Sequence, residues 1–511
     1  MNLLFISDIT IDPIAREISK IQGDIRINTE YHEDLSARLL NTGNSFADYD
    51  FVLVHSDQIF HNKPVTWQKQ LIELAINLFS KNPTTRFIFT NTFSLAYESR
   101  GLAESTGHEN NTFTAYQSQL DNLRSLDNTF VLDIKRIISN EGINNLYNYS
   151  LGILYQMPYT KKMLQLLASE IVSLLTFLST EEKKVIVLDC DNTLWRGVVG
   201  EDGIEGIGCD KNHDGIVFYN FQQFLAQKKA EGFILCLCSK NNEADVKEAF
   251  EKKSMPLTWN DFILKKVNWH EKSNNVHEIA KELNLGEDSF IFVDDNPFEL
   301  GVIQEFTKIK TVFKFENNFN ALLSLQSSYA FRRKKILKAD LEKTQQYQTE
   351  LLRKENENSF GSVEDYIKSL EIKVDIKEND VNDLERLAQM TEKTNQFNFN
   401  KKAFSVGNLK EWIDKGNFVF SCKVSDKFGD YGTVGLILAK KENSDVILEN
   451  YLMSCRALGK NVEFDFYNHT IETLKKKGLN LKEIIFVESA KNEPARTFLK
   501  QINYDHISRT V

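Results

Sequence analysis

Residues 185–196 read VIVLDCDNTLWR and decide the fold of the chain around them. Four apolar, mostly β-branched residues predict a buried strand of a parallel sheet. Asp189 and Asp191 follow the strand at once, two positions apart, in what must be a turn. Ligands of open α/β sheets bind beyond the carboxyl ends of the strands, and carboxylates there suit a hard cation such as Mg²⁺. The stretch therefore predicts a parallel α/β sheet with a metal-assisted phosphoryl-transfer site at its edge.

Polar side chains also follow the other predicted strands of this region. Ser239 comes directly after one apolar run, and Asp294 and Asp295 come after another. Lys272 stands at the start of a helical stretch between them. Taken singly, the serine could cap a helix, the lysine could lie on the surface and the aspartates could form a turn. Taken together, in this order at strand ends, they predict one shared site.

The order Asp189-x-Asp191-x-Thr193 after an apolar strand resembles the first motif of the haloacid dehalogenase (HAD) superfamily. The longer string 189–206, DCDNTLWRGVVGEDGIEG, resembles the FkbH-like branch of that superfamily. The resemblance implies that Asp189 is the nucleophile or first Mg²⁺ ligand. It also implies that Asp191 is the general acid/base and that its backbone carbonyl meets the metal.

The same resemblance gives roles to the later residues. Asp294, with Asp295 as second choice, supplies the remaining carboxylate for Mg²⁺. Ser239 hydrogen-bonds a phosphoryl oxygen. Lys272 neutralises the incoming charge and the phosphoaspartate, in line with the rule that phosphoryl transfer depends mainly on positioning and electrostatics.

FkbH-like proteins are associated with taking a glyceryl group from 1,3-bisphosphoglycerate and passing it to an acyl carrier protein. The resemblance therefore implies a Mg²⁺-dependent enzyme that couples phosphoryl hydrolysis to acyl transfer onto a carrier thiol in a biosynthetic pathway. A simple phosphatase acting on a small phosphorylated metabolite is the alternative within the same site. A non-catalytic module that docks carrier proteins is a third class, and the complete set of site residues speaks against it.

Cys190 stands between the two aspartates, and two roles are open for it. A nearby cation would lower the pKa of its thiol, and the resemblance then implies that Cys190 carries the acyl group as a thioester. Alternatively, Cys190 is a small buried side chain that points into the sheet, because residues 189 and 191 should face the site. Cys236 and Cys238 lie on a predicted buried strand and are expected to be packing residues.

The spacing of the motifs predicts a HAD unit without a cap domain. Thr193 and Ser239 are 46 positions apart, Ser239 and Lys272 are 33 apart, and Lys272 and Asp294 are 22 apart. None of these intervals leaves room for a large inserted domain. An open site suits a bulky substrate such as a carrier protein, although the flanking domains or a second subunit could also cover it.

Residues 1–180 alternate apolar strands, expected at 3–6, 51–54, 86–90 and 129–132, with helical stretches. This pattern predicts a parallel-sheet α/β domain. It is similar to the SGNH-hydrolase-like or flavodoxin-like domain that precedes the HAD unit in longer FkbH-like proteins. Ser7 and Asp8, after the first strand, could be an active pair, but a turn and helix cap is favoured. We expect this domain to be catalytically silent.

Residues 181–325 form the predicted HAD unit, and residues 326–360, rich in Lys, Arg, Glu and Gln, predict a solvated helical connector. Residues 361–511 form the third domain, with a predicted antiparallel pair at 433–439 and 446–453. The segment from Arg456 to Gly459 then opens a helix. This domain resembles the GNAT acyltransferases, an α+β fold. The resemblance implies that Arg456 and Gly459 help to hold CoA or phosphopantetheine, whose phosphates suit a helix N-terminus.

The composition limits the remaining classes of function. The chain has 511 residues, a net charge of −10 and a pI of about 5.6, which argues against nucleic acid as a main partner. We expect no membrane-spanning helix, and we expect the apolar N-terminus to be a strand and not a signal peptide. The six cysteines show neither disulfide-scaffold nor zinc spacing, so a cytoplasmic location is predicted. Near the site, Trp195 and Trp269 are expected in the core and His213 on the surface.

Overall fold

The structure, a computed structural model, forms two compact units, residues 1–180 and residues 181–511. The residues described are 1–33, 35–40, 46–57, 82, 84–91, 120–121, 123, 128–336, 349, 353, 362–454, 457–489, 491–502 and 507–510.

The first unit is built on a parallel sheet of five strands in the order β2-β1-β3-β4-β5. Its strands are β1 (Asn2–Ser7), β2 (Arg26–Tyr31), β3 (Phe51–His55), β4 (Arg86–Thr90) and β5 (Thr129–Leu132). Its described helices are α1 (Asp12–Ile21), α2 (Leu35–Leu40), α6 (Ile134–Glu141), α7 (Ile143–Leu146), α8 (Tyr149–Tyr155) and α9 (Lys161–Ser179). The four predicted strands are present, and β2 was missed because its sequence, RINTEY, is polar and half-exposed.

Helix α9 bears on the expectation that the chain has no membrane-spanning helix, which stays a prediction. It is the one helix in the described chain that is long and apolar enough to cross a membrane, by length and composition only. Its apolar residues contact α1, α6, α7 and β5, and eight of its nineteen residues are buried. Such burial is typical of the core helix of a globular domain.

The second unit begins with a parallel sheet in the order β10-β9-β6-β7-β8. Its strands are β6 (Val185–Leu188), β7 (Ile234–Ser239), β8 (Phe262–Val267), β9 (Phe290–Asp294) and β10 (Val312–Lys314). The helices are α10 (Val199–Gly206), α11 (Ile216–Ala230), α12 (Glu243–Lys252), α13 (Lys272–Leu283), α14 (Pro297–Phe306) and α15 (Phe319–Ser327). Residues 185–314 are all described, and these helices and loops leave no inserted cap domain among them.

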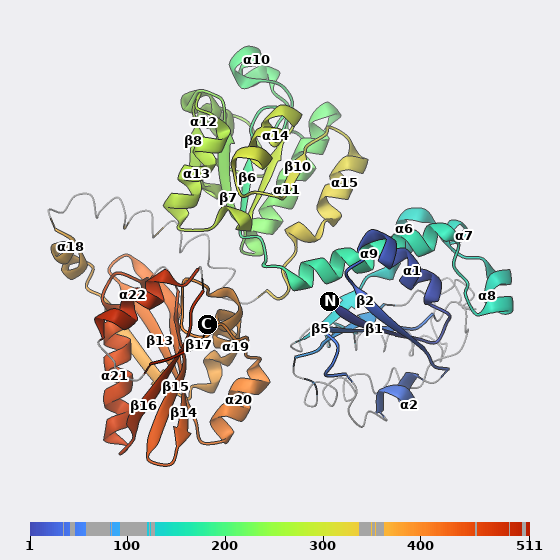
Figure 1. Ribbon diagram of the computed structural model, residues 1–511. Helices are drawn as coiled ribbons and strands as arrows, with labels where there is room; N and C mark the ends of the chain where they lie inside the picture. The colour runs from blue at the N-terminus through green and yellow to red at the C-terminus, as the bar shows by residue number, and fades with distance from the viewer. Residues whose placement is uncertain are drawn as a thin grey trace, which may run out of the picture. The chain divides into compact units, whose positions relative to one another are not determined.

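Alternate residues of the central strand β6 divide the core of this sheet into two clusters. Ile186 and Leu188 pack with residues of α11, α12 and α15, whereas Val185 and Val187 pack with residues of α13 and α14. Both faces of the sheet are therefore covered, which explains why β6 and β7 consist almost wholly of apolar residues. Figure 1 shows β6 and β7 between these helices.

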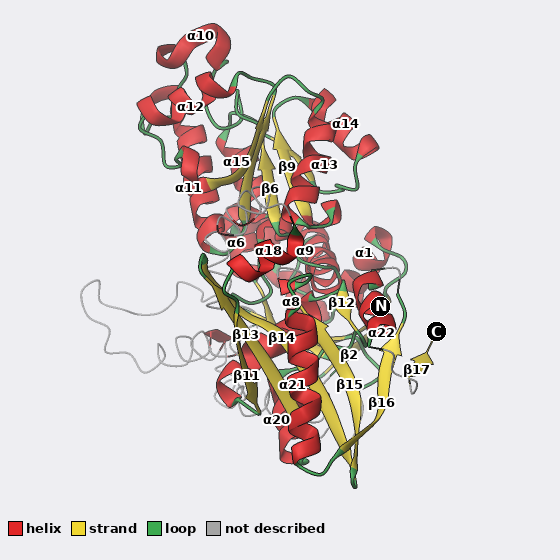
Figure 2. Ribbon diagram, turned by 90° about the vertical axis from the view of Figure 1, so that its left-hand side faces the viewer, coloured by secondary structure: helices red, strands yellow, loops and turns green. Residues whose placement is uncertain are grey.

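The second sheet of this unit is mixed, in the order β11-β13-β14-β15-β16-β17, with β12 also paired to β15. Its strands are β11 (Lys373–Glu378), β12 (Phe397–Asn398), β13 (Phe418–Asp426), β14 (Gly429–Glu442), β15 (Asp445–Met453), β16 (Asn480–Val487) and β17 (Ile507–Thr510). Its helices are α18 (Val363–Ser369), α19 (Leu384–Lys393), α20 (Val406–Asp414), α21 (Val462–Lys476) and α22 (Glu493–Gln501). The residues of α21 and α22 pack on one core cluster and those of α19 and α20 on another. Figure 2 shows α21 lying along the sheet.

The prediction of a multi-domain α/β chain with parallel sheets is confirmed. The predicted hairpin is also present, because β14 and β15 pair antiparallel around a turn at Asn443, whose φ is +57°. Strands β8, β10, β11 and β13 were missed by the sequence analysis. Most of the expected connector, 326–360, lies outside the described residues, so its helical character and the four-part division of the chain stay predictions.

Candidate active site

Three carboxylates gather at the carboxyl edge of the five-stranded sheet in the second unit. Asp189 follows β6, and Asp294 and Asp295 lie at the end of the neighbouring β9. One oxygen from each of the three lies within 4.8 Å of the other two. The Asp189 amide donates a hydrogen bond to the Val293 carbonyl, which ties the turn after β6 to β9. Sheet pairing thus brings together residues that are more than 100 positions apart in the sequence.

Lys272 lies among these carboxylates, at the first position of α13. Its Nζ is 2.9 Å from Asp189 Oδ1 and 2.6 Å from Asp294 Oδ2, and its side chain is only 5% exposed. Burial alone would lower the pKa of this lysine, but the two carboxylates outweigh burial and hold the pKa above its ordinary value. Lys272 is therefore a fixed cation at the centre of the cluster.

One lysine does not balance three carboxylates. Burial raises the pKa of Asp294 to about 6, and repulsion from Asp189 adds to the rise. Burial and the same neighbour also raise the pKa of Asp295. Oxygen donors at this spacing with excess negative charge are what Mg²⁺ binds in proteins. The cluster therefore fits a divalent cation, with Asp189, Asp294 and Asp295 as side chains that would hold it.

The turn after β9 is fixed by its own hydrogen bonds. The Asn296 amide donates to Asp294 Oδ1 at 2.9 Å, and Asn296 Oδ1 accepts from the Phe298 amide at 3.0 Å. Pro297 then starts α14, where its missing N–H is not needed. The segment Asp-Asp-Asn-Pro is thus both a helix cap and the holder of two site carboxylates.

Asp191 points its carboxylate into a set of three hydrogen bonds and not into the carboxylate cluster. Oδ1 accepts from Trp195 Nε1 at 2.9 Å and from the Val199 amide at 3.0 Å, and Oδ2 accepts from Asn241 Nδ2 at 2.9 Å. These donors fix the side chain close to the ligand cluster. The expectation that Asp191 would meet a metal through its backbone carbonyl stays a prediction.

Asn241 links Asp191 to Ser239, and it was not among the residues predicted to form the site. Its Nδ2 donates to Asp191 and also to Ser239 Oγ, the latter at 3.1 Å. The Ser239 hydroxyl also interacts with the Cys190 thiol by a side-chain hydrogen bond. Thr193 Oγ1 is buried and has no hydrogen-bond partner in the described chain. Asn241 lies two residues after Ser239, which ends a predicted strand, and this position was the sequence feature that could have identified it as a site residue.

Cys190 lies in the core. It is fully buried and belongs to the cluster that contains Leu194, Trp195 and Phe218. Burial raises the pKa of its thiol well above the ordinary value, and the Asp189 carboxylate adds to the rise. The lowering of this pKa by a bound cation stays a prediction. The acyl-carrying role of Cys190 stays a prediction, while Cys236 and Cys238 are buried packing residues as expected.

The rim of the site carries exposed aromatic side chains. Trp269 is 69% exposed, and its Nε1 donates to Asn242 Oδ1 at 3.1 Å. Phe298, at the start of α14, is equally exposed. The expected core position is confirmed for Trp195, which is fully buried, and is wrong for Trp269. A tryptophan that follows a strand by two residues lies on the loop, beyond the reach of the core.

Three further predicted residues are Arg456, Gly459 and His213. Arg456 lies outside the described residues, and the Gly459 amide donates to Glu463 Oε1 at 3.2 Å. Gly459 has a φ of +75°, which favours glycine. The exposure of His213 stays a prediction.

In the first unit the polar residues that follow the strands are buried and form hydrogen bonds with neighbouring residues of the same unit. Ser7 Oγ accepts from the Ile9 amide, as expected for a turn, and Asp8 accepts from the Ser56 hydroxyl and the Asp57 amide. Burial lowers the pKa of His55 to about 4, so this imidazole is neutral. The described part of this unit thus shows a structural polar network, and its catalytic silence stays a prediction.

No protein-family model matches the sequence, and no curated protein is found as a relative. Among solved structures, the chain is similar to the N-terminal part of the protein BF1531 from Bacteroides fragilis, which contains a phosphatase domain and was crystallised with Mg. The identity is 24% and the TM-score 0.55, over 66% of this chain and 94% of that one. Two others are the ribosomal-protein-S18-alanine N-acetyltransferase from Escherichia coli and an aminoglycoside N-acetyltransferase in complex with CoA. They are 13% and 12% identical with TM-scores of 0.20 and 0.21, over 26% and 27% of this chain and 77% and 93% of theirs. The likeness to the Bacteroides structure shows that the chain shares the fold of a solved protein with a phosphatase domain.

Proposed function

We propose that this chain is a Mg²⁺-dependent phosphoryl-transfer enzyme of the HAD class, with its active site at the carboxyl edge of β6. The observation that carries the proposal is the buried Lys272, which contacts Asp189 and Asp294 in a cluster of three carboxylates. A buried lysine between two carboxylates that still leaves a negative excess is costly for stability alone. It is well suited to a site that must hold a cation and a phosphoryl group together.

The side chains divide the reaction between them. Asp189 Oδ attacks the phosphorus, and the bond from phosphorus to the leaving oxygen breaks. Asp191 gives a proton to the leaving oxygen, and then takes one from the water that cleaves the Asp189 phosphoester. Ser239 and Lys272 bind the phosphoryl oxygens. A bound Mg²⁺ would supply charge neutralisation on those oxygens.

The finer proposal is that this chemistry serves acyl transfer. The FkbH-like string 189–206 supports a phosphorylated acyl substrate of the glyceryl type, which carries an acyl phosphate and a phosphate ester. A thiol attacks the carbonyl carbon of the acyl phosphate, the bond from that carbon to the phosphate oxygen breaks, and phosphate leaves. The acyl group then passes by thioester exchange to the thiol of an acyl carrier protein in a biosynthetic pathway, while Asp189 removes the ester-linked phosphate. The open, capless edge of the sheet supports a bulky acceptor. We place this enzyme in the cytoplasm. The alternatives are a simple phosphatase and an acyltransferase that acts through the GNAT-like domain with CoA or phosphopantetheine.

The first experiment compares Mg²⁺-dependent phosphate release by wild type, by Asp189→Asn and by Asp214→Asn, with 1,3-bisphosphoglycerate as substrate. Asp214 is exposed and lies outside the site, so it is the matched control. We expect Asp189→Asn to lose phosphate release at least 1,000-fold and Asp214→Asn to keep it. Equal activity in all three proteins would show that the site is elsewhere.

The second experiment measures the intact mass of wild type and of Cys190→Ala after the same incubation. A glyceryl-sized adduct on the wild type alone would establish transfer through Cys190. Phosphate release without an adduct would favour the simple phosphatase or a transfer without a cysteine intermediate.

A further inference from the structure

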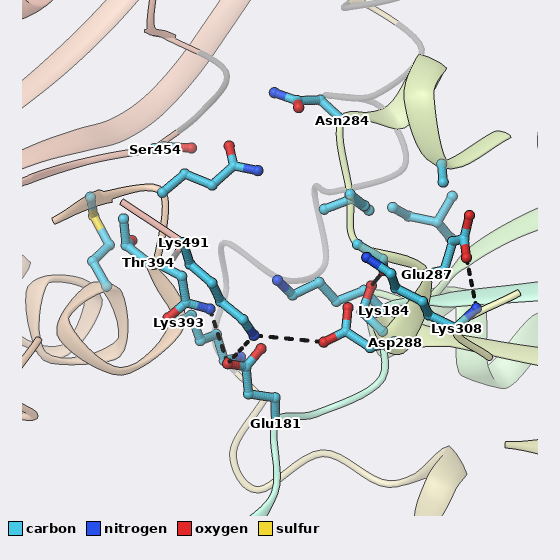
Figure 3. Close-up of a pocket in the computed structure, with 18 of the residues that line it drawn as sticks. Glu181, Lys184, Asn284, Glu287, Asp288, Lys308, Lys393, Thr394, Ser454 and Lys491 are labelled. Carbon is cyan, nitrogen blue, oxygen red and sulfur yellow. Dashed lines mark hydrogen bonds and ion pairs between the residues drawn. The ribbon is translucent and has the colours of Figure 1, made fainter. Parts of the chain in front are cut away.

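A cavity of about 800 Å³ lies at the opposite edge of the parallel sheet from the carboxylate cluster. Lys184, just before β6, and the turn 286–289, just before β9, line one side of it (Figure 3). The other side is lined by residues 393–396 at the end of α19, by Met453 and Ser454 at the end of β15, and by Lys491. Because β6 lies between Lys184 and Asp189, the two sites are roughly 15 Å apart along the strand. The cavity is therefore separate from the candidate active site.

The charge of the cavity is opposite to that of the chain. The lining includes six cations and three acids, whereas the whole chain has 62 Lys and Arg against 72 Asp and Glu. The cations of the lining are Lys184, Lys281, Lys308, Arg386, Lys393 and Lys491, and the acids are Glu181, Glu287 and Asp288. A concave surface with an excess of one sign of charge attracts ligands of the other sign.

Lys491, one of these cations, forms only long ion pairs at an exposed position. Lys491 Nζ is 3.8 Å from a Glu181 oxygen and 3.7 Å from an Asp288 oxygen, and its side chain is 60% exposed (Figure 3). Ion pairs of this length between exposed groups contribute little to stability, so an incoming anion can replace them. By contrast, Lys393 is 2.9 Å from the buried Glu182 and is tied to the fold.

Lys401 lies near the cavity, and burial is the main cause of the shift in its pKa. Burial lowers the pKa of Lys401 to about 8, and the cations of Lys184 and Lys491 act in the same direction. The carboxylates of Glu181 and Glu392 oppose this shift but do not cancel it.

The volume of the cavity and its apolar lining residues restrict the class of ligand further. Cavities of about 300–1,000 Å³ are typical of sites for cofactors and drug-sized molecules. Leu285, Met390 and Met453 give this cavity an apolar side next to the lysines. A single inorganic ion would leave most of it empty, whereas an organic molecule with phosphate groups would use both parts.

We propose that this cavity is a second ligand site, which binds the phosphate groups of a small organic molecule of nucleotide or CoA size through Lys184, Lys308 and Lys491. The proposal is independent of the reaction at Asp189. A ligand bound here would contact residues that flank both the parallel sheet and the mixed sheet of the second unit.

The test is calorimetric titration of the full chain, in EDTA, with inorganic pyrophosphate, ATP and CoA as separate probes. The cavity variant is the double substitution Lys308→Gln and Lys491→Gln, since both lysines are exposed and neither is part of a core. Lys410→Gln, an exposed lysine of α20, is the remote control, and Lys240→Gln at the rim of the active site is the second control. Circular dichroism and thermal unfolding verify that all variants are folded.

We expect ATP or CoA to bind with a dissociation constant below about 1 mM, and the double variant to weaken that binding at least tenfold. The two controls should stay within twofold of wild type, and pyrophosphate should bind more weakly than the organic probe. The proposal is wrong if none of the three probes binds, if the double variant binds them as wild type does, or if Lys240→Gln is the variant that loses binding.

Discussion

Replacing Lys272 by methionine tests the reasoning about the site most directly. The change keeps the length of the side chain and removes its charge. Asp189 and Asp294 would then be two buried carboxylates, 6% and 0% exposed, without their shared cation. Removal of one partner from a buried ion pair typically costs about 3–5 kcal/mol. Lys272→Met should therefore lower the free energy of unfolding of this domain by about that amount in EDTA at pH 7.5.

Lys253→Met is the matched control. Lys253 Nζ is 3.5 Å from Glu205, and the two side chains are 27% and 98% exposed. Pairs that water reaches contribute about 0–1 kcal/mol, so this variant should lose no more than that. Urea unfolding followed by tryptophan fluorescence measures both, because Trp195, Trp259 and Trp269 all lie in this domain.

The pH dependence gives a second, independent readout of the same variant. A raised carboxyl pKa means that the folded chain binds the proton more tightly than the unfolded chain, so stability falls as pH rises through that pKa. Asp294 already has a pKa of about 6 beside Lys272, and loss of the cation should raise it further. The deficit of Lys272→Met should therefore shrink at pH 5, where the Asp294 carboxyl takes up a proton. A deficit below about 1 kcal/mol at pH 7.5, equal to that of Lys253→Met, would refute the central role of this lysine.

Three further predictions follow from the same geometry. The dissociation constant for Mg²⁺, measured by calorimetry, should rise as pH falls through about 6, because protonated Asp294 cannot bind the ion, and Asp294→Asn should bind weakly with little pH dependence. Cys190 should resist a thiol reagent in the folded chain without Mg²⁺, because burial raises its pKa; mass spectrometry of the labelled peptide checks this, and rapid labelling would contradict the burial. Trp195→Ala should lower the free energy of unfolding by about 3–5 kcal/mol, whereas the exposed Trp269→Ala should change it by less than about 0.5 kcal/mol, and similar losses for the two would contradict their placement.

The sequence predicted the site best where the chemistry and the strand signal coincide. Asp189, Ser239 and Asp294 each end an apolar run, so their meeting at one edge follows from parallel pairing alone. Strands without such a run were missed. In β11, KVDIKE, and β2, RINTEY, every second residue is polar and exposed or half-exposed, and no apolar stretch marks them as strands.

The sequence could not predict in which direction each side chain of a turn points, and Cys190 shows why. It lies between two aspartates of the site, so its position in the chain suggested a thiol beside a cation. The backbone after β6 instead turns Asp189 toward Lys272 and Asp191 toward Asn241, while Asn192 adopts a φ of +52° and accepts from the Gly197 amide. With its neighbours directed at the crevice, Cys190 packs among Leu194 and Phe218. Cys190 is thus buried beside the site, where its thiol interacts with the Ser239 hydroxyl, and a sequence position between two aspartates could not reveal that burial.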